Sequence, residues 1–480
     1  MKQFLSFATF GKKAKLFLAL FLFVALYINT NAQCTSATGW KQMSQGIDFG
    51  VALKNDGTIW MWGRNINGVR GNGTATGVVK HPEQIGTDTD WKEIYTGSYF
   101  VLALKNNGDL YGWGDNSFGQ LGLGNNTDVH SPTKIASGIK SFSPGYFHTT
   151  IVKTDGTLWS AGYNEWGNLG IGNNSGQNTF KQESSNATNW EKTYSGWYNS
   201  FGIKSNGTLW SCGSHNYRVT GQGENSGSIN TFAQVGSGTN WSSLAVSWNH
   251  VLALTSAGKV WAWGHSNNGR LGIVSPGQAY YATPQAIDAA NNYTAVSTGY
   301  NHSMVLRADG AAFAGGVNEL GKLGIGTNDA DTAGKAFQRM GSASNWASLT
   351  YRMGDYNTGI INSDTEMFSA GADEYYQLGN GDGTATVSTS LTQTVCKDDL
   401  AVNDVTKNKV ISVYPNPAKD IINLSSQQKI SEVKIYNVAG ALIKTDTNVI
   451  GNKVNVSQLK PGVYIVKVND TNDGIKFIKN

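Results

Sequence analysis

The chain has 480 residues, among them 59 glycines, 15 tryptophans and 20 tyrosines, and 15% of its residues are charged. Abundant aromatic residues and low charge exclude a disordered chain, and the glycine content disfavours a helical protein, because glycine weakens a helix interior by roughly 1 kcal/mol relative to alanine. An all-β protein with many tight turns fits this composition, whereas three cysteines are too few for a disulfide-dense miniature or a zinc ribbon.

Residues 1–32 have the pattern of a secretory signal peptide. Four lysines, the last of them Lys15, precede the apolar run Leu16 to Leu26, and Thr30-Asn31-Ala32 has the small residues of a cleavage site. The run is shorter than the about 20 residues of a membrane-spanning helix. We therefore expect a mature chain that starts at Gln33, has no transmembrane segment and is formally neutral once the four leader lysines are removed.

A unit of about 50 residues recurs seven times between residues 33 and 396. Each copy ends a strand on a glycine, and most copies place a turn such as Asn-Gly and an aromatic residue before it. The closing glycines are Gly63, Gly114, Gly162, Gly213, Gly264, Gly316 and Gly371. Alternating residues predict four short strands per unit, and a lone four-stranded sheet cannot bury both faces. We therefore predict a seven-bladed β-propeller over residues 33–396.

The two ends of the repeat region are predicted to meet in one blade. The strand Trp40–Met43 has no strand before it in the first unit, and Ser388 to Val395 is a surplus segment after the last glycine loop. We expect these two segments to pair and close the ring. Cys34 and Cys396 lie just outside the junction, where an oxidising compartment favours a disulfide over two free thiols. Cys212 is expected to be a buried, inert thiol.

The recurring pattern G-x-x-H-x-x-A-L-K-x-D-G-T-L-W-x-W-G-x-N-x-x-G-Q-L-G-x-G resembles the regulator of chromosome condensation repeat. It is carried by Gly145 to Gly172 and by Asn249 to Gly272. The resemblance implies a propeller over about three quarters of the chain but says little about function, because this fold hosts unrelated activities. Nuclear members exchange nucleotide on a small GTPase, a partner that an exported protein does not meet. Secreted bacterial members that bind other proteins are the closer parallel.

Residues 397–409 lack aromatic residues and mix charges of both signs, so they are predicted to be a linker. From Val410 to the end, alternating segments predict a small antiparallel β-sandwich of about 70 residues. Its landmarks are Tyr414-Pro415-Asn416-Pro417, Asn437-Val438-Ala439-Gly440, Leu459-Lys460-Pro461-Gly462 and the terminal Gly474 to Asn480. They are similar to the C-terminal sorting domain of the type IX (Por) secretion system.

That resemblance implies export across the outer membrane of a Bacteroidetes-type bacterium through contact with the secretion machinery. The product would be released or held at the cell surface, and removal of the tail stays open. A generic adhesive sandwich is the alternative reading of residues 410–480.

One repeat position holds histidine in three units, His148, His250 and His302, and Phe49, Phe100, Asn199 and Asn357 in the others. Equivalent positions in separate blades are spread around a ring, whereas a metal or proton-transfer site needs converging groups. We therefore interpret this position as structural.

Acidic residues and known motifs give no stronger indication of catalysis. Asp56, Asp155 and Asp309 are expected in hairpin turns, where aspartate tolerates positive φ. The sequence has no G-x-S-x-G elbow, P-loop or H-E-x-x-H motif. We expect no catalytic residue, metal or cofactor.

Large aromatic residues precede the histidine position in most units, in the turn between two strands. They are Tyr99, Tyr146, Phe147, Trp197, Tyr198, Trp248, Tyr300 and Tyr356, here called the turn aromatics. Tyrosine and tryptophan combine rigid area with a polar tip and are frequent in binding hot spots. A ligand-binding rim and a cover over the seams between blades are both consistent with this pattern.

The formal charge of residues 33–396 is about −4, which excludes the basic footprint of a nucleic-acid binder. We predict an exported, monomeric binding protein that recognises a protein or polysaccharide through one face of the propeller. The alternatives are a secreted polysaccharide-active enzyme and a passive cell-surface structural protein.

Overall fold

The computed structural model describes residues 38–224, 227–273, 278–329, 334–381, 387–396, 411–426, 430–438, 440–447, 449–469 and 475–480. Contacts divide the chain into two compact units, residues 1–397 and 398–480. The predicted signal peptide, the predicted linker and Cys34 lie outside the described residues. Within the described ranges, no helix has the length and hydropathy to cross a membrane.

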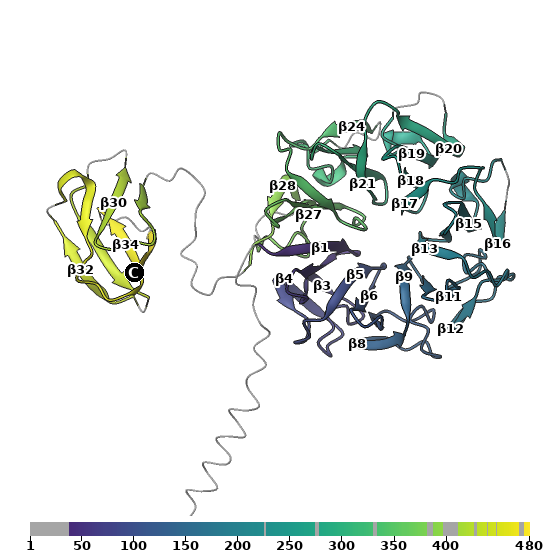
Figure 1. The fold of residues 1–480 in the computed structure, drawn as a ribbon, viewed down its shortest axis with the longest axis horizontal. Coiled ribbons are helices and arrows are strands. Elements are labelled where there is room, and N and C mark those ends of the chain that lie inside the picture. The colour runs from purple at the N-terminus through teal and green to yellow at the C-terminus, as the bar shows by residue number, and fades with distance from the viewer. Residues whose placement is uncertain are drawn as a thin grey trace, which may run out of the picture. The chain divides into compact units, whose positions relative to one another are not determined.

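The first unit is a ring of four-stranded antiparallel sheets, and seven such sheets are formed by its described strands (Figure 1). The first three sheets contain β1 (Trp40–Gln45), β2 (Phe49–Lys54), β3 (Ile59–Asn65), β4 (Gly77–Gln84), then β5 (Trp91–Thr96), β6 (Phe100–Lys105), β7 (Leu110–Gly114), β8 (Val129–Ala136), then β9 (Ile139–Pro144), β10 (His148–Lys153), β11 (Leu158–Gly162), β12 (Gln177–Gln182). The fourth and fifth contain β13 (Trp190–Ser195), β14 (Asn199–Lys204), β15 (Leu209–Ser214), β16 (Ser228–Gln234), then β17 (Trp241–Val246), β18 (His250–Thr255), β19 (Val260–His265), β20 (Tyr280–Asp288). The last two contain β21 (Tyr293–Thr298), β22 (His302–Arg307), β23 (Ala312–Gly316), β24 (Lys335–Arg339), then β25 (Trp346–Leu349), β26 (Asn357–Asn362), β27 (Met367–Ala372), β28 (Val387–Gln393).

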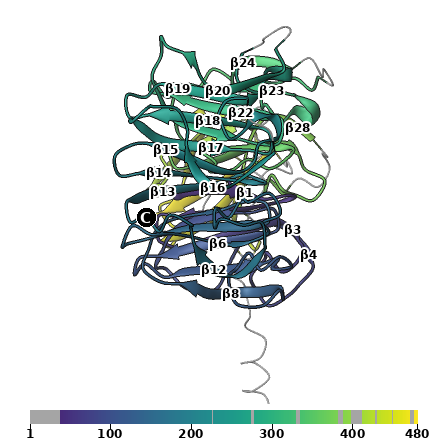
Figure 2. The same cartoon turned by 90° about the vertical axis from the view of Figure 1, so that its right-hand side faces the viewer.

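Each blade places its first strand towards the ring axis and its fourth strand at the outside (Figure 1). Turned by 90°, the ring is seen from its side, and the strands of nearer and farther blades overlap in this view (Figure 2). Three short 3-10 helices, η1 (Asn216–Arg218), η2 (Asn267–Gly269) and η3 (Glu319–Gly321), lie in the loops between third and fourth strands.

The closing glycines are required by the pairing of the second and third strands. In every blade the closing glycine is opposite the first residue of the second strand, as in the pair His148 and Gly162. Gly162 has a φ of 114°, and a Cβ atom there would lie 2.5 Å from the carbonyl oxygen of Phe147. No other residue fits such a position, which explains the regular spacing of these glycines.

Tryptophan residues before the closing glycines join neighbouring blades. The Nε1 of Trp113 donates a hydrogen bond to the carbonyl oxygen of Val69 in the preceding blade at 2.9 Å, and Trp263 makes the same bond to Val219 at 2.8 Å. Both indoles are fully buried, so each bond satisfies a polar group that would otherwise be unpaired. These tryptophans are therefore packing residues, as the sequence pattern indicated.

The predicted strand exchange between the two ends of the repeat region is wrong. Strand β28 pairs with β27, and β1 pairs with β2, so each sheet is built from four consecutive strands. The first blade already has its fourth strand, β4, which contains Pro82, and the segment after the last glycine loop is the ordinary fourth strand of the seventh blade. There is consequently no surplus segment.

The ring closes instead by the same contacts that join the other blades. Trp62 in the first blade donates its Nε1 hydrogen bond to the carbonyl oxygen of Gln377 in the seventh at 2.9 Å. Along the inner strand β1, the backbone of Met43 accepts a hydrogen bond from Tyr351 at 3.0 Å, and Gln45 donates to Arg352 at 3.1 Å.

The cysteines are partly accounted for by the described residues. Cys396 is disulfide-bonded, and because its predicted partner Cys34 is outside the described residues, their pairing stays a prediction. Cys212 is a fully buried free thiol whose pKa is raised by burial, in agreement with the inert role expected for it.

The second unit contains two sheets. One is formed by β29 (Ile411–Tyr414), β30 (Ile421–Ser426) and β33 (Lys453–Asn455), and the other by β32 (Leu442–Asp446), β31 (Val433–Asn437), β34 (Gly462–Val468) and β35 (Ile475–Lys479), with the short helix η4 (Ile450–Asn452) before β33. Side chains of both sheets, including Ile422, Val454, Ile435, Val466 and Phe477, form one buried core.

Candidate functional site

The turn aromatics lie in the turns between the first and second strands, on one face of the ring. Hydrogen bonds join these turns from blade to blade: Ile47 donates its backbone N–H to Ser98 at 3.1 Å, and Tyr146 donates to Gly196 at 3.0 Å. The hydroxyl of Ser98 also donates to the carbonyl oxygen of Tyr146 at 2.5 Å. These bonds therefore connect the turns of blades 1 to 4.

Four of the turn aromatics come together as one cluster, here called the aromatic cluster: Tyr146, Trp197, Trp248 and Tyr300. The ring centroids of Tyr146 and Trp197 are 3.9 Å apart, those of Trp197 and Trp248 5.6 Å, and those of Trp248 and Tyr300 5.1 Å with nearly parallel planes. Trp197 also contacts Tyr300, two blades away, at 5.5 Å. All four side chains are half-buried.

The other turn aromatics surround this cluster or lie apart from it. Phe147 contacts Tyr146 and also Phe118 of the second blade, and Tyr198 contacts Trp197. Tyr356 is 42% exposed, and the ammonium of Lys322 lies 5.3 Å from its ring centroid. Tyr99 is half-buried, and its pKa is raised by burial and by the nearby Asp48. The turn aromatics are thus unevenly distributed around the ring, with their aromatic surface concentrated on blades 3 to 6.

A cavity of about 440 Å³ lies beside the cluster, with residues of the fourth and fifth blades and Trp166 of the third blade in its lining. It is lined by Trp166, Tyr198, Asn199, Ser214, Asn216, Tyr217, Arg218, Val219, Trp248 and Tyr280. Only Tyr198 and Trp248 in this set were expected from the sequence. The rings form two contacting groups: Trp166 is 6.4 Å from Tyr198, and Tyr217 is 5.1 Å from Trp248 and 6.0 Å from Tyr280.

The centre of the ring is filled by Tyr351 and Arg352, which the sequence analysis did not single out. The Tyr351 ring lies 3.7 Å from that of Tyr95, its hydroxyl is 3.0 Å from the Ser143 hydroxyl, and Arg352 donates to the carbonyl oxygen of Gly145 at 3.3 Å. The turn of the seventh blade runs over seven residues between β25 and β26, whereas the other turns have three.

A cavity of about 20 Å³, which is room for about one water, lies beside Tyr351 and Arg352.

Charged groups beside the cluster have shifted pKa values. Burial raises the pKa of Asp355, while Arg352 and Lys322 act in the opposite direction. Burial lowers the pKa of Lys322 to about 8, and its ammonium has no hydrogen-bond partner among the described residues. Asp355 occupies the turn position that tyrosine or tryptophan has in blades 3 to 6, so the cluster has an acidic neighbour on the seventh blade.

The histidine position is structural in the described residues. His148, His250 and His302 are fully buried. The Nε2 of His148 is 2.9 Å from the Ser200 hydroxyl, and that of His250 is 2.7 Å from the Ser303 hydroxyl, each in the next blade. Burial lowers the pKa of His148 to about 3, which keeps the ring neutral. No three potential metal ligands gather anywhere in the described ranges.

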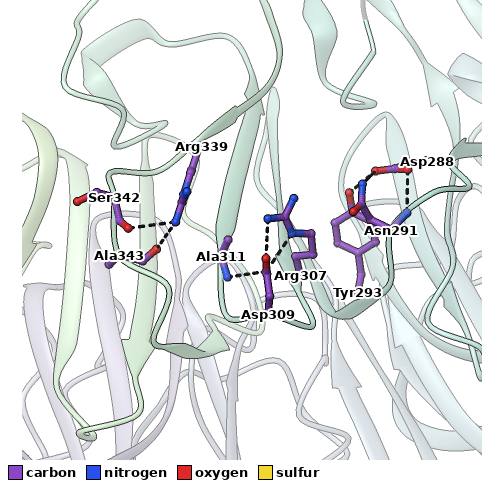
Figure 3. Close-up of polar contacts among 9 residues, drawn as sticks. All are labelled: Asp288, Asn291, Tyr293, Arg307, Asp309, Ala311, Arg339, Ser342 and Ala343. Carbon is purple, nitrogen blue, oxygen red and sulfur yellow. Dashed lines mark hydrogen bonds and ion pairs between the residues drawn. The ribbon is translucent and has the colours of Figure 1, made fainter.

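The aspartates in the hairpin turns accept hydrogen bonds from backbone N–H groups. Asp309 accepts a hydrogen bond from the N–H of Ala311 at 3.1 Å and pairs with Arg307 at 2.6 Å (Figure 3). Asp56 and Asp155 accept the N–H of Thr58 and Thr157 at 3.0 Å in the same way. These carboxylates stabilise turns, as their position in the repeat indicated.

Three family models match the chain, two for one repeat and one for a C-terminal domain. Models of the regulator of chromosome condensation (RCC1) repeat match residues 107–152 and 257–306 and, in a second form, residues 40–69, 91–120 and 241–270. The model of the secretion system C-terminal sorting domain matches residues 412–480. The sorting domain implies type IX secretion in a Bacteroidetes-type bacterium, so the chain is secreted or located at the cell surface.

Relatives of known sequence are similar to the repeat region. The ultraviolet-B receptor UVR8 of Arabidopsis thaliana is 30% identical over 294 residues, which are 60% of this chain and 55% of the receptor. The RCC2 homolog of Xenopus laevis is 41% identical over 83 residues, which are 17% of this chain and 16% of that protein. The chain thus spans about half the length of the plant receptor and a small part of the frog protein.

Solved structures agree on the fold. Human WBSCR16 has a TM-score of 0.59 at 18% identity and covers 70% of this chain and 94% of its own. Yeast RCC1 (Prp20), solved with Kap60, has a TM-score of 0.58 at 19% identity and covers 66% of this chain and 78% of its own. Identity this low supports the propeller fold and not a shared function. The chain therefore contains segments that match the RCC1 repeat, within an all-β fold similar to that of RCC1 propellers, and its residues 412–480 match the secretion system C-terminal sorting domain.

Proposed function

We propose that this chain is an exported binding protein that recognises a protein or polysaccharide through the face that carries the aromatic cluster, and that it acts by binding rather than by catalysis. The proposal takes the seven four-stranded sheets as the seven blades expected from the sequence and the two C-terminal sheets as the expected sandwich. The sorting domain delivers this face to the exterior.

The observation that carries the proposal is the joining of Tyr146, Trp197, Trp248 and Tyr300 into one half-buried surface. Each ring comes from a different blade, so the contacts depend on the assembled ring. Packing within a blade does not require large residues in these turns, because the first blade has Ile47 and the second has Ser98 at the same position. Rigid aromatic surface with polar tips is the usual composition of a binding hot spot.

The test is the double substitution of Trp197→Ala and Trp248→Ala. We expect ligand affinity to fall by about tenfold or more, because each truncation removes a hot-spot contact, while the ring stays folded. Binding is measured by surface plasmon resonance against extracellular proteins and polysaccharides, and folding by thermal denaturation.

Trp159→Ala is the matched control. Trp159 is at the start of β11, at the opposite end of the strand from the closing Gly162, and donates its Nε1 hydrogen bond to Thr157 at 2.8 Å. This variant should keep ligand affinity. Equal affinity for the wild type and the folded double variant would contradict the proposed function.

A further inference from the structure

The cavity between blades 4 and 5 exists at a position where the repeat is broken. Five residues after the closing glycine, five blades have a second glycine: Gly68, Gly119, Gly167, Gly269 and Gly321. The fourth blade has Arg218 there, and the seventh has Tyr376. Both Tyr217 and Arg218 have left-handed backbones, with φ of 58° and 62°. Tyr217 shares this conformation with the equivalent residues Asn67, Asn268 and Leu320, whereas Arg218, like Tyr376 in the seventh blade, has it where five blades have glycine.

The glycines at this position hold the seams between blades closed. A Cβ atom on Gly119 would lie 2.5 Å from the Cα of Asn178, and one on Gly167 would lie 2.6 Å from the Cα of Asn230. Asn178 and Asn230 belong to β12 and β16, the fourth strands of the following blades. At the equivalent position Arg218 lines the cavity beside Tyr280, although this seam keeps its backbone hydrogen bond, from Gly223 to Ala282 at 2.9 Å.

The residues that line this cavity provide both apolar surface and polar groups. Five aromatic rings provide flat apolar area, and Ser214, Asn216 and the tyrosine hydroxyls provide neutral polar groups. Arg218 is the one charged residue of the lining, and its Nε donates to Glu224 at 2.9 Å. The cavity thus offers apolar faces, hydrogen-bonding groups and little net charge.

We propose that this cavity binds a neutral sugar, and that the polysaccharide is therefore the ligand class of the proposed binding face. A pyranose ring presents an apolar C–H face, which stacks on an aromatic ring, and hydroxyl groups at its edge, which bond to amide, hydroxyl and guanidinium groups. A volume of about 440 Å³ is within the range of small-ligand sites and suits about one or two sugar rings. An acidic sugar is disfavoured because Glu224 neutralises Arg218.

This inference rests on the proposed function and makes it specific. A protein ligand would cover the aromatic cluster over a wider area and would not depend on a pocket of this size. The two cases therefore differ in their response to Arg218, which lines the cavity but is not part of the aromatic cluster.

The test measures binding of neutral oligosaccharides (glucans, xylan, mannan and chitin fragments) and of the acidic fragments of pectate and alginate to the purified chain by isothermal titration calorimetry. We expect at least one neutral oligosaccharide to bind and the acidic ones to bind more weakly. Arg218→Gly restores the glycine of five other blades and removes the arginine side chain from the lining of the cavity, so affinity should fall by about tenfold or more.

Two further variants make the result interpretable. Tyr376→Gly makes the same change at the same repeat position in the seventh blade, away from the cavity, and should bind like the wild type. Tyr280→Ala removes a 42% exposed ring from the cavity without altering the backbone turn and should also weaken binding.

Three results would overturn the inference. The first two are failure of every neutral oligosaccharide to bind and unchanged affinity in the Arg218→Gly variant. A protein ligand that is lost on Trp197→Ala and Trp248→Ala but retained by Arg218→Gly would also overturn it, and would leave the proposed function standing.

Discussion

The seam between blades 3 and 4, here called the closed seam, and the seam between blades 4 and 5, here called the open seam, are made from the same repeat. Both have the backbone hydrogen bond to the following blade, from Gly172 to Asn230 at 2.8 Å and from Gly223 to Ala282 at 2.9 Å, but the open seam has a cavity beside it. In the first, Gly167 lets Asn230 of the next blade approach to van der Waals contact. In the second, Arg218 occupies the equivalent position with a φ of 62°. Positions that hold the same residue in most blades are those at which packing between blades requires that residue. A residue that departs from the repeat although its backbone is strained indicates a position whose residue is not chosen by packing.

Gly167→Arg is expected to have the largest effect, because it would impose the arrangement of the open seam on the closed one. The new Cβ would meet the backbone of Asn230 at 2.6 Å, so β16 has to move or the blades have to separate. We expect a loss of at least about 3 kcal/mol in the free energy of unfolding. Guanidinium denaturation measures it.

Gly86→Arg separates the two causes of that loss, which are the contact with the next blade and the strain of a left-handed backbone. Gly86 also has a positive φ, 64°, but nothing lies within 4 Å of the Cβ that a substitution would add. This control should lose only the cost of a left-handed backbone, about 1–2 kcal/mol. Equal losses in the two variants would show that contact across the seam is not what requires glycine.

The second prediction concerns protonation in the closed seam, where His148 contacts Ser200 across blades 3 and 4. Burial, and to a smaller extent Arg352, lower the pKa of His148 to about 3, below the value of about 6.5 in an unfolded chain. Between these values the unfolded state binds more protons. The stability contribution is therefore complete above about pH 6.5 and falls as the pH decreases towards 3.

At pH 5 this histidine should destabilise the ring by about 2 kcal/mol relative to neutral pH. His148→Asn, which places in the third blade the residue that blades 4 and 7 have at this position, should abolish that part of the loss. Denaturation midpoints of both proteins at pH 7 and pH 5 provide the measurement. His130→Asn, a change on the outer strand β8, is the control, and an acid response of His148→Asn identical to that of the wild type would contradict the prediction.

The difference between the two seams also shows what could be predicted from the sequence. Strands, closing glycines and seam tryptophans such as Trp113 follow a repeat with a fixed physical cause, and the structure has them where the pattern placed them. Ring closure was predicted wrongly because the strand that contains Pro82 was not recognised as the fourth strand of the first blade. The position of the turn aromatics on one face followed from the repeat, but their association on blades 3 to 6 did not.

The features missed are those that occur once. Tyr351 and Arg352 fill the axis because the turn of the seventh blade is longer than the others, and no repeat comparison indicates where an extra segment folds. Arg218 was visible as a departure from a glycine position, so this signal was available in the sequence. Its consequence, a cavity rather than a distorted strand, depends on how the side chains of η1 and β20 meet, which is a property of the assembled ring.

The smallest expected effect is that of Arg218→Gly on stability, and it is the most informative about the open seam. The substitution removes the strain of a left-handed arginine, which stabilises the fold by about 1–2 kcal/mol. Glycine also raises the entropy of the unfolded chain, which destabilises the fold by about 0.5–1 kcal/mol. Loss of the solvent-exposed pair with Glu224 adds at most about 1 kcal/mol. The free energy of unfolding should therefore change by less than about 1 kcal/mol, as measured by guanidinium denaturation.

A loss above about 2 kcal/mol in that variant would mean that Arg218 holds blades 4 and 5 together, and that the cavity is a by-product of this contact. A change of nearly zero in the free energy of unfolding would support the opposite conclusion. The arginine would then contribute nothing to the ring that glycine does not, and its retention in a strained conformation, where five other blades have glycine, would need a reason outside folding. Binding in the cavity that it opens is such a reason.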